Sequence, residues 1–466
     1  MLIRTTIRLG SYAVLTLIML NACSVQSYQA KPINTAEISA KIESKNPDSP
    51  AFGEYLHQEG YNKQPFPIQR WGVDELAYCA LFFHPNLEVA RAKWRAAQVN
   101  EQAATEKAMP SLNSQIAHSN NANQDISPYA LGLSIDMPIE TANKRNLRIE
   151  NAQHLSHIAQ LEIAQTAWQL RHLAVQSLIN TQFNQQLIQL LTQELTLKTQ
   201  IVAMQQKRVS LGMSSNIELS HAKLQEQVTR ADLQAANQQQ TVLLSELANH
   251  LGLPLPTVTR MSLQSYDDYL NPISAQLSLE NTHSAALLNR LDIRIALIQY
   301  ATAETKLKLE IARQYPDITI SPAYAYEFGN HVWSLGLSGL LTLLNKNKVA
   351  IAEATQLREV EAAQFEALQQ SVIAEVLTNH AKLTEAQQNF SQQQSLNAQQ
   401  AANTQRIEKK LAAGEIDKLE FSFAKLEQIA AEKNLALAKF QRNSAAHQLE
   451  NALQKPLATA REKSEP

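Results

Sequence analysis

Glycine and proline are scarce in this chain, and their absence from four long tracts is its first notable feature. Only 11 of the 466 residues are Gly and 16 are Pro. Neither residue occurs in the ranges 139–211, 213–251, 340–413 and 415–455. Because Gly and Pro interrupt helices, and these tracts are rich in Ala, Gln, Leu, Glu and Lys, each tract is predicted to be helical. A helix over 139–211 would be about 110 Å long, which suits a rod or a tube.

Other absences exclude whole classes of protein. Lys and Arg number 41 against 43 Asp and Glu, so the chain lacks the basic excess of a nucleic-acid binder. Beyond the N-terminus, no window holds 18 consecutive apolar residues, so no transmembrane helix is expected in the mature chain, and any membrane crossing must use strands. Nucleophile elbows, phosphate loops, HExxH motifs and paired cysteines are absent. We therefore expect neither an enzyme nor a cofactor.

Residues 1–22 have the layout of a secretory signal peptide, with Arg4 and Arg8 ahead of a short apolar run. Ala22 directly before Cys23 resembles the bacterial lipobox, in which the cysteine is acylated and becomes the first mature residue. The resemblance implies a lipoprotein carrying palmitate, and Ser24 after the cysteine implies sorting to the outer membrane. The alternative is an ordinary signal peptide followed by a cysteine that is not acylated.

The chain contains only one further cysteine, Cys79. If Cys23 is acylated, Cys79 has no intramolecular partner, and a disulfide scaffold is excluded. We interpret Cys79 as a small buried hydrophobe.

The sequence also repeats itself. Residues 208–224 (RVSLGMSSNIELSHAKL) align with 410–426 (KLAAGEIDKLEFSFAKL), with Gly, Glu, Ser, Ala, Lys and Leu in register. Residues 86–92 (NLEVARA) likewise resemble 290–296 (RLDIRIA). The chain is therefore two copies of a unit of about two hundred residues, each read as short helix, strand pair, long helix, Gly-containing turn and return helix.

This repeat sets the predicted domain boundaries. Segments 24–70 and 255–288 are richer in Pro, Ser, Asn and Tyr than the repeats. The expected order is a signal peptide at 1–22, an N-terminal extension at 23–70, a first repeat at 71–254, a linker at 255–288, a second repeat at 289–456 and a tail at 457–466.

Alternating apolar and small or polar residues predict a strand at about 129–137 and its counterpart at 332–339. Partner strands are expected at about 111–118 and 317–326, each just after a proline that ends the preceding helix. The alternation is typical of a transmembrane barrel, with Tyr324, Tyr326 and Trp333 in an aromatic girdle. The alternative is the edge of a soluble sandwich, but the long flanking helices leave no room for a second sheet.

Four strands cannot close a barrel, because the smallest transmembrane barrels have about 8. Open edges would leave backbone groups unpaired in lipid. The strands therefore require several copies of the chain.

In their order and doubling, these features resemble the TolC-type outer membrane factor family over essentially the whole mature chain. Segments 138–152 (PIETANKRNLRIENA) and 344–354 (LNKNKVAIAEA) are similar to those of its cation-efflux, CzcC-like branch. The resemblance implies a mainly α-helical fold, with a homotrimer forming a 12-stranded barrel and a long helical tunnel. It also implies a lipid-anchored outer-membrane location reaching into the periplasm, a periplasmic adaptor, and an inner-membrane pump of the RND type.

The candidate functional residues lie at the two helix reversals. Gly212 and Gly414 would form the periplasmic tips, which in the family contact the adaptor. Glu218 and Glu420 each stand six residues after their glycine, where the family places acidic residues of the closed entrance, and Asp417 is a nearby candidate. A carboxylate ring from three chains would concentrate cations. The plainer interpretation is an acid on a solvated helix face.

Two further motifs are interpreted as structural features and not as functional sites. His154 and His157 form an HxxH on a helix, but without a third ligand at a fitting spacing we expect polar surface residues and no metal. Lys144, Arg145 and Arg148 are expected to anchor the barrel rim at lipid headgroups, and the alternative is a role in selectivity.

The sequence thus predicts a passive exit duct of a tripartite efflux pump, with heavy-metal cations as the favoured cargo. One alternative keeps the fold and exports drugs, solvents or a secreted polypeptide. The alternative from another class is a periplasmic coiled-coil scaffold lipoprotein that conducts nothing.

Overall fold

The computed structural model describes residues 27–120, 127–270, 289–327, 329–339 and 346–457. It divides into two compact units, 1–44 and 45–466. In the first, α2 (Thr35–Glu43) begins at Asn34, whose side chain accepts a hydrogen bond from the Glu37 amide. The predicted signal peptide, Cys23, linker residues 271–288 and all of the tail except residue 457 lie outside the described residues.

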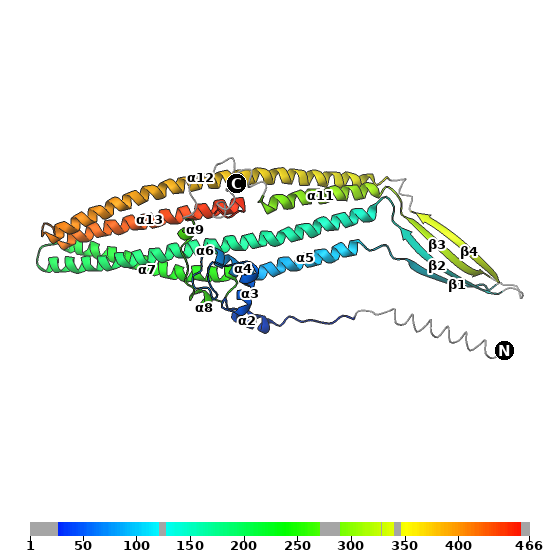
Figure 1. The fold of residues 1–466 in the computed structure, drawn as a ribbon, viewed down its shortest axis with the longest axis horizontal. Coiled ribbons are helices and arrows are strands. Elements are labelled where there is room, and N and C mark those ends of the chain that lie inside the picture. Colours follow the sequence, from blue (N-terminus) through cyan, green and yellow to red (C-terminus); the bar gives the residue numbers. More distant parts are fainter. Residues whose placement is uncertain (1–26, 121–126, 271–288, 328, 340–345, 458–466) are drawn as a thin grey trace. The chain divides into compact units, whose positions relative to one another are not determined.

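Two helical hairpins make up most of the second unit (Figure 1). The first joins α6 (Lys144–Ser210) to α7 (Asn216–Leu251), and the second joins α12 (Lys348–Ala412) to α13 (Lys418–Leu453). The remaining helices are α3 (Pro50–Gln58), α4 (Val73–Phe83), α5 (Pro85–Ala104), α8 (Leu255–Val258), α9 (Tyr266–Leu270) and α11 (Leu291–Ala312). Because α7 and α13 cover about half of their long partners, α5 and α11 pack along the other halves.

The long helices begin later than the Gly- and Pro-free tracts, at residues 144 and 348 instead of 139 and 340. Before α6, Ala142 and Asn143 have φ of 53° and 62°, and before α12, Lys346 and Asn347 have φ of 51° and 49°. These left-handed pairs turn the chain from strand to helix at matching places in both repeats. Absence of Gly and Pro did not reveal this turn, since non-glycine residues make it at a cost in backbone strain.

Two apolar clusters hold the helices together. The larger lies where α3, α4, α8 and α9 pack on α6 and α7, and its fully buried members include Phe52, Leu76, Leu178 and Leu247. A smaller cluster joins α11, α12 and α13. Cys79 is fully buried in the larger cluster, which confirms its expected role as a small hydrophobe.

One antiparallel sheet stands at the end of the long helices opposite their reversals (Figure 1). Its order is β1 (Ser111–His118), β2 (Tyr129–Ile139), β3 (Ile318–Glu327) and β4 (Asn330–Gly339). All four strands lie within two residues of the ranges predicted from the sequence. Within the described part of the chain, β1 and β4 each pair on one side only. None of the described helices combines the length and hydropathy needed to cross a bilayer.

Candidate functional site

The two faces of the sheet differ in chemistry. Leu133 pairs with Tyr324, which pairs with Trp333, so one row across β2, β3 and β4 is wholly apolar or aromatic. The adjacent row, Ser134, Ala323 and Ser334, is small or polar and points to the other face. Along β2 the apolar side chains are the more exposed ones, with Leu131 51% and Leu133 45% exposed. A slip of one residue would exchange the two faces, so this register is strongly specified.

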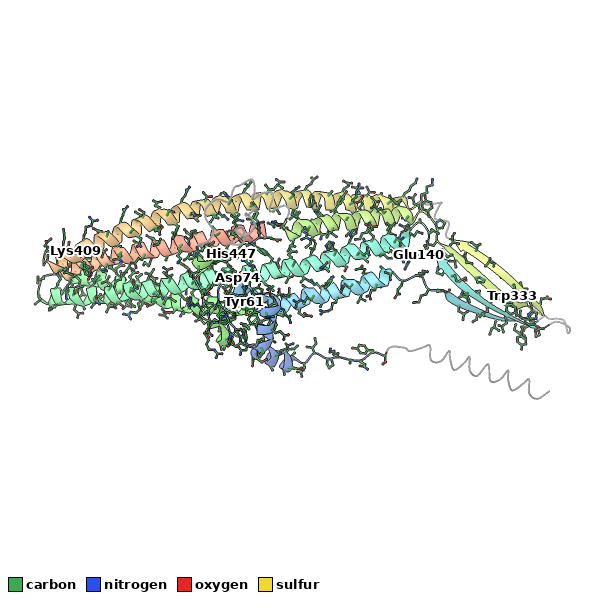
Figure 2. The ribbon with its side chains drawn as sticks, viewed as in Figure 1. Tyr61, Asp74, Glu140, Trp333, Lys409 and His447 are labelled. Carbon is green, nitrogen blue, oxygen red and sulfur yellow. The ribbon has the colours of Figure 1, made fainter. Side chains whose placement is uncertain are left out.

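Aromatic and imidazole rings gather at the loop end of the apolar face, where Figure 2 labels Trp333. The Tyr324 and Trp333 ring centroids lie 4.8 Å apart, and those of Tyr326 and His331 lie 5.4 Å apart. Trp333 is 79% exposed. Large exposed rings at one end of an apolar strand face are typical of the interfacial girdle of membrane strands.

At the helix end of the sheet, Lys144 departs from the role expected for it. Its side chain is buried, and Nζ donates hydrogen bonds to the Tyr315 carbonyl oxygen at 2.6 Å and to Asp317 Oδ1 at 2.8 Å. A buried, ion-paired ammonium is not free to reach lipid headgroups. Lys144 instead links α6 of the first repeat to Asp317, directly before β3 of the second repeat.

The other two cations of this segment are also engaged within the chain. Arg148 forms an ion pair with Glu140, which Figure 2 labels at the junction of sheet and helices, and this partner raises the pKa of Arg148. Arg145 Nε donates to the Thr105 carbonyl oxygen at 3.0 Å, at the end of α5. From α6, Lys144 and Arg148 therefore bind residues next to the strand ends, and Arg145 binds the end of α5.

The helix reversals have the same backbone geometry in both repeats. Gly212 and Gly414 have φ of 71° and 74°. Met213 N donates to the Arg208 carbonyl oxygen at 2.8 Å, and Glu415 N donates to the Lys410 carbonyl oxygen at 3.0 Å. This is the hydrogen-bond pattern of a Schellman motif, in which glycine adopts the left-handed conformation at low cost.

Glu218 lies at the start of α7 and is engaged locally. Its carboxylate accepts hydrogen bonds from the Ser214 hydroxyl and from the Ser215 amide, and the Ser215 hydroxyl accepts from the Glu218 amide at 3.2 Å. The hydrogen bond from Ser214 is the main reason that its pKa is lowered. Glu218 is thus the reciprocal member of a capping box.

Asp417 plays two parts in the second hairpin. Oδ1 accepts a hydrogen bond from the Glu420 amide at 2.8 Å and caps α13, while Oδ2 lies 3.1 Å from Arg208 Nη1 at the end of α6. Glu420 itself lies in the first turn of α13. Asp417 therefore links the two hairpins. The carboxylate of Glu218 instead binds residues of its own hairpin, Ser214 and Ser215.

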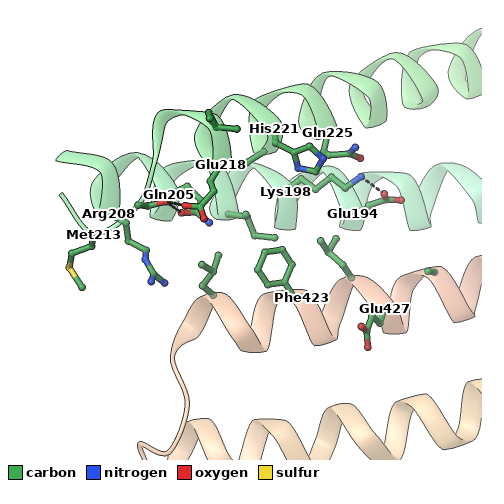
Figure 3. Close-up of a pocket in the computed structure, with 17 residues that line it drawn as sticks. Glu194, Lys198, Gln205, Arg208, Met213, Glu218, His221, Gln225, Phe423 and Glu427 are labelled. Carbon is green, nitrogen blue, oxygen red and sulfur yellow. Dashed lines mark hydrogen bonds and ion pairs between the residues drawn. The ribbon is translucent and has the colours of Figure 1, made fainter. Parts of the chain in front are cut away.

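A groove of about 910 Å³ opens beside these tips, between the first hairpin and α13 (Figure 3). Its walls include Met213, Ile217 and Phe423, which are 65%, 81% and 48% exposed. Glu218 and Arg208 stand at its edge. The tips therefore present an apolar hollow bordered by charge.

Sequence reasoning missed a buried polar cluster that joins α6, α9 and α13. The Arg171 Nη2 to Glu450 Oε1 distance is 2.8 Å, and the Tyr269 hydroxyl donates to the same oxygen at 2.5 Å. The rings of His172 and His447 stack with centroids 4.6 Å apart. Burial lowers the pKa of His172 to about 4. No motif marks this cluster, because its members lie far apart in the sequence.

The HxxH pair has no metal-binding geometry. His154 Nε2 lies 3.8 Å from Glu150 Oε1, and His157 is exposed. Among the described residues, no group of three His, Cys, Asp or Glu side chains is placed to hold a metal ion.

Comparison with known proteins extends these observations. Residues 76–253, which cover most of the first repeat, match the family model for outer membrane efflux proteins. The cobalt-zinc-cadmium resistance protein CzcC of Cupriavidus metallidurans is 25% identical over 244 residues, which cover 50% of this chain and 54% of CzcC. The match thus spans about half the length of this curated relative.

Solved structures match over a larger share of the chain. VceC of Vibrio cholerae has a TM-score of 0.67 at 16% identity, covering 83% of this chain and 96% of VceC. CusC has a TM-score of 0.66 at 18% identity, covering 83% and 95%, and the outer-membrane channel OprN has 0.68 at 15%, covering 94% and 100%. At these identities the likeness establishes the fold alone. This chain thus has a mainly α-helical, TolC-like fold, and most of its first repeat matches the outer membrane efflux protein family.

Proposed function

We propose that this chain forms the outer-membrane exit channel of a tripartite efflux pump. The observation that carries the proposal is the sheet, which has one apolar face, one small polar face and two strand edges that pair on one side only within the described chain. Lipid accepts such strands only when the edges are closed and the apolar face points outward.

Three copies would close the sheet. Four strands are too few, whereas three chains would contribute 12, within the range of known transmembrane barrels. The paired long helices would continue the barrel as a tunnel through the periplasm. The small polar face of each sheet would then line the water-filled interior.

The helical tips are proposed to meet a periplasmic adaptor and, through it, an inner-membrane pump of the RND type. Support comes from the apolar groove beside Gly212, where Ile217 is 81% exposed. A passive duct has no energy source of its own, so the pump must supply the driving force. Glu218, Glu420 and Asp417 remain candidates for the entrance, with Asp417 favoured by its link to Arg208.

Heavy-metal cations are the proposed cargo class. CzcC, a named cobalt-zinc-cadmium resistance protein, supports this choice through its 25% identity over half of the chain. Anchoring by a lipid on Cys23 is proposed from the lipobox-like Ala22-Cys23 step and is testable by labelling with radioactive palmitate, with Cys23→Ser as the control.

Growth of a deletion strain tests the function. The strain, with and without a plasmid carrying the wild-type gene, is grown on graded zinc, cobalt, cadmium, copper and silver beside a panel of dyes and antibiotics. Hypersensitivity to metals alone, reversed by the plasmid, is the expected result. Sensitivity only to organic compounds would replace the cargo with drugs or solvents.

A second experiment separates a channel from a periplasmic scaffold. Membranes are treated with protease, and the heat-modifiable migration of the protein is followed on gels. We expect residues 129–137 to be protected and the unheated species to migrate as an oligomer. A monomer digested completely in intact membranes would eliminate the channel.

A further inference from the structure

The strand hairpins carry charge of one sign only. No Lys or Arg occurs between Lys107 and Lys144 or between Arg313 and Lys346. The same two stretches contain five acids, namely Asp125, Asp136, Glu140, Asp317 and Glu327. A carboxylate on any of the four strands therefore has no Lys or Arg side chain beside it on the sheet.

Two of these acids are neutralised at the helix end of the sheet. Glu140 is paired with Arg148, and Asp317 Oδ1 lies 2.8 Å from Lys144 Nζ. Asp136 differs, because its Oδ2 accepts a hydrogen bond at 2.7 Å from the neutral amide of Asn113. Among the ion pairs of the described residues, none includes Asp136.

The strand register places Asp136 on the small polar face. Along β2 it continues the series Gly132 and Ser134, while its neighbours Ile135 and Met137 belong to the exposed apolar face. On β1 it pairs with Ser111, one level from the Asn113–Ser134 pair. The hydrogen bond from Asn113 runs between adjacent rows of this face and fixes the orientation of the carboxylate.

We propose that Asp136 is a specificity-determining residue of the strand-lined section and makes it prefer cations over anions. The inference rests on the proposed function, in which three chains enclose this face. Three carboxylates would then stand at one level of the aqueous passage that the strands enclose, against low-dielectric walls. Such rings attract cations and repel anions in channel constrictions.

The amide of Asn113 suits this role better than a basic partner would. It holds the carboxylate in place without cancelling its charge, whereas Arg148 and Lys144 cancel the charges of Glu140 and Asp317. Selection for cations would thus operate in the membrane section itself, separately from any carboxylates at the helical tips.

Reversal potentials in planar bilayers test the proposal. Full-length protein is reconstituted across a KCl gradient, and the potassium-to-chloride permeability ratio is measured for wild type, Asp136→Asn and Asp136→Glu. Asn keeps the size and an acceptor for Asn113, so folding is expected to survive, but the ratio should fall by about twofold or more. Asp136→Glu should retain a cation preference close to that of wild type.

The outcomes separate the inference from the function on which it rests. Conducting Asp136→Asn channels with an unchanged ratio would overturn the role of Asp136 and leave the channel intact. Equal loss of selectivity in Asp136→Glu would also overturn it, because the charge would not be the cause. Absence of any conductance from oligomeric protein, both for wild type and for Asp417→Ala, which breaks the link between the tips, would overturn the proposed channel itself.

Discussion

Arg208 Nη1 lies 3.1 Å from Asp417 Oδ2, so the end of the long helix in the first hairpin is ion-paired with the start of the return helix in the second. The two side chains are 37% and 59% exposed. Pairs this exposed contribute at most about 1 kcal/mol and weaken with salt. The link is therefore easily broken and adds little to the stability of the fold.

The two oxygens of Asp417 have separable roles, and this gives a first prediction. Asp417→Asn removes the charge facing Arg208 but keeps an acceptor for the Glu420 amide, whereas Asp417→Ala removes both. Loss of the cap should cost about 1 kcal/mol locally. Hydrogen exchange of the amides at the start of α13 should rise slightly in Asp417→Asn and about fivefold more in Asp417→Ala.

Two variants serve as controls for this experiment. Arg208→Ala should behave like Asp417→Asn, because it breaks the same pair. Ser215→Ala should expose the start of α7 and leave α13 unchanged, since Ser215 caps the first hairpin. Equal exchange in Asp417→Asn and Asp417→Ala would show that the cap does not stabilise this turn.

The second prediction compares two glycines with nearly the same backbone conformation. Gly212 and Gly252 have φ of 71° and 68°. A Cβ at Gly212 would meet nothing within 4 Å, whereas one at Gly252 would lie 2.8 Å from Phe83 O and His84 Cα. Gly212→Ala should cost about 1–2 kcal/mol, from left-handed strain alone, and Gly252→Ala should cost distinctly more. Chemical denaturation of the two variants measures the difference, and equal losses would contradict the steric argument.

The third prediction concerns pH. Burial lowers the pKa of His172 to about 4, while an unfolded histidine titrates near 6.5. The unfolded state therefore binds the proton first, so the contribution of neutral His172 is complete above about pH 6.5 and is lost as the pH falls towards 4.

Denaturation midpoints between pH 7 and 4 check this sign. His172→Asn should reduce the fall in stability across that window relative to wild type. His154→Asn, which changes another histidine of the same helix in the same way, is the matched control. The same slope in His172→Asn and wild type would mean that other groups, such as Glu450, dominate the acid response.

Local patterns predicted the strands and turns well, because their causes are local. The alternation in 129–137, the prolines before β1 and β3, and the glycines at 212 and 414 each act over a few residues. The capping box at Glu218 was not predicted, although a serine three residues before a glutamate is its local signal, and it gives that side chain a structural role beside the proposed entrance role. Its part in an entrance remains a prediction.

Contacts between distant residues were not predictable in this way. Lys144 reads as an exposed cation near a helix start, and only the fold brings it to Asp317, 173 residues later. Arg171 and Glu450 are 279 residues apart, and each looks like an ordinary charge in a polar helix. Pairing of β2 with β3 brings Lys144 near Asp317, whereas packing of α13 against α6 brings Arg171 to Glu450.

The last prediction tests which face of the sheet meets lipid, using neighbouring residues on one strand. Leu133 lies on the exposed apolar face, and Ser134 lies on the small polar face. In a barrel, Leu133→Lys would place a charge against hydrocarbon at a cost of about 2–4 kcal/mol near the bilayer midplane, while Ser134→Lys would point into water. The amount of heat-modifiable oligomer in the outer membrane should fall sharply for Leu133→Lys and little for Ser134→Lys. Since the two sites are adjacent and receive the same side chain, the reverse order would require the sheet to face the other way, and equal, undiminished yields would mean that it does not contact lipid.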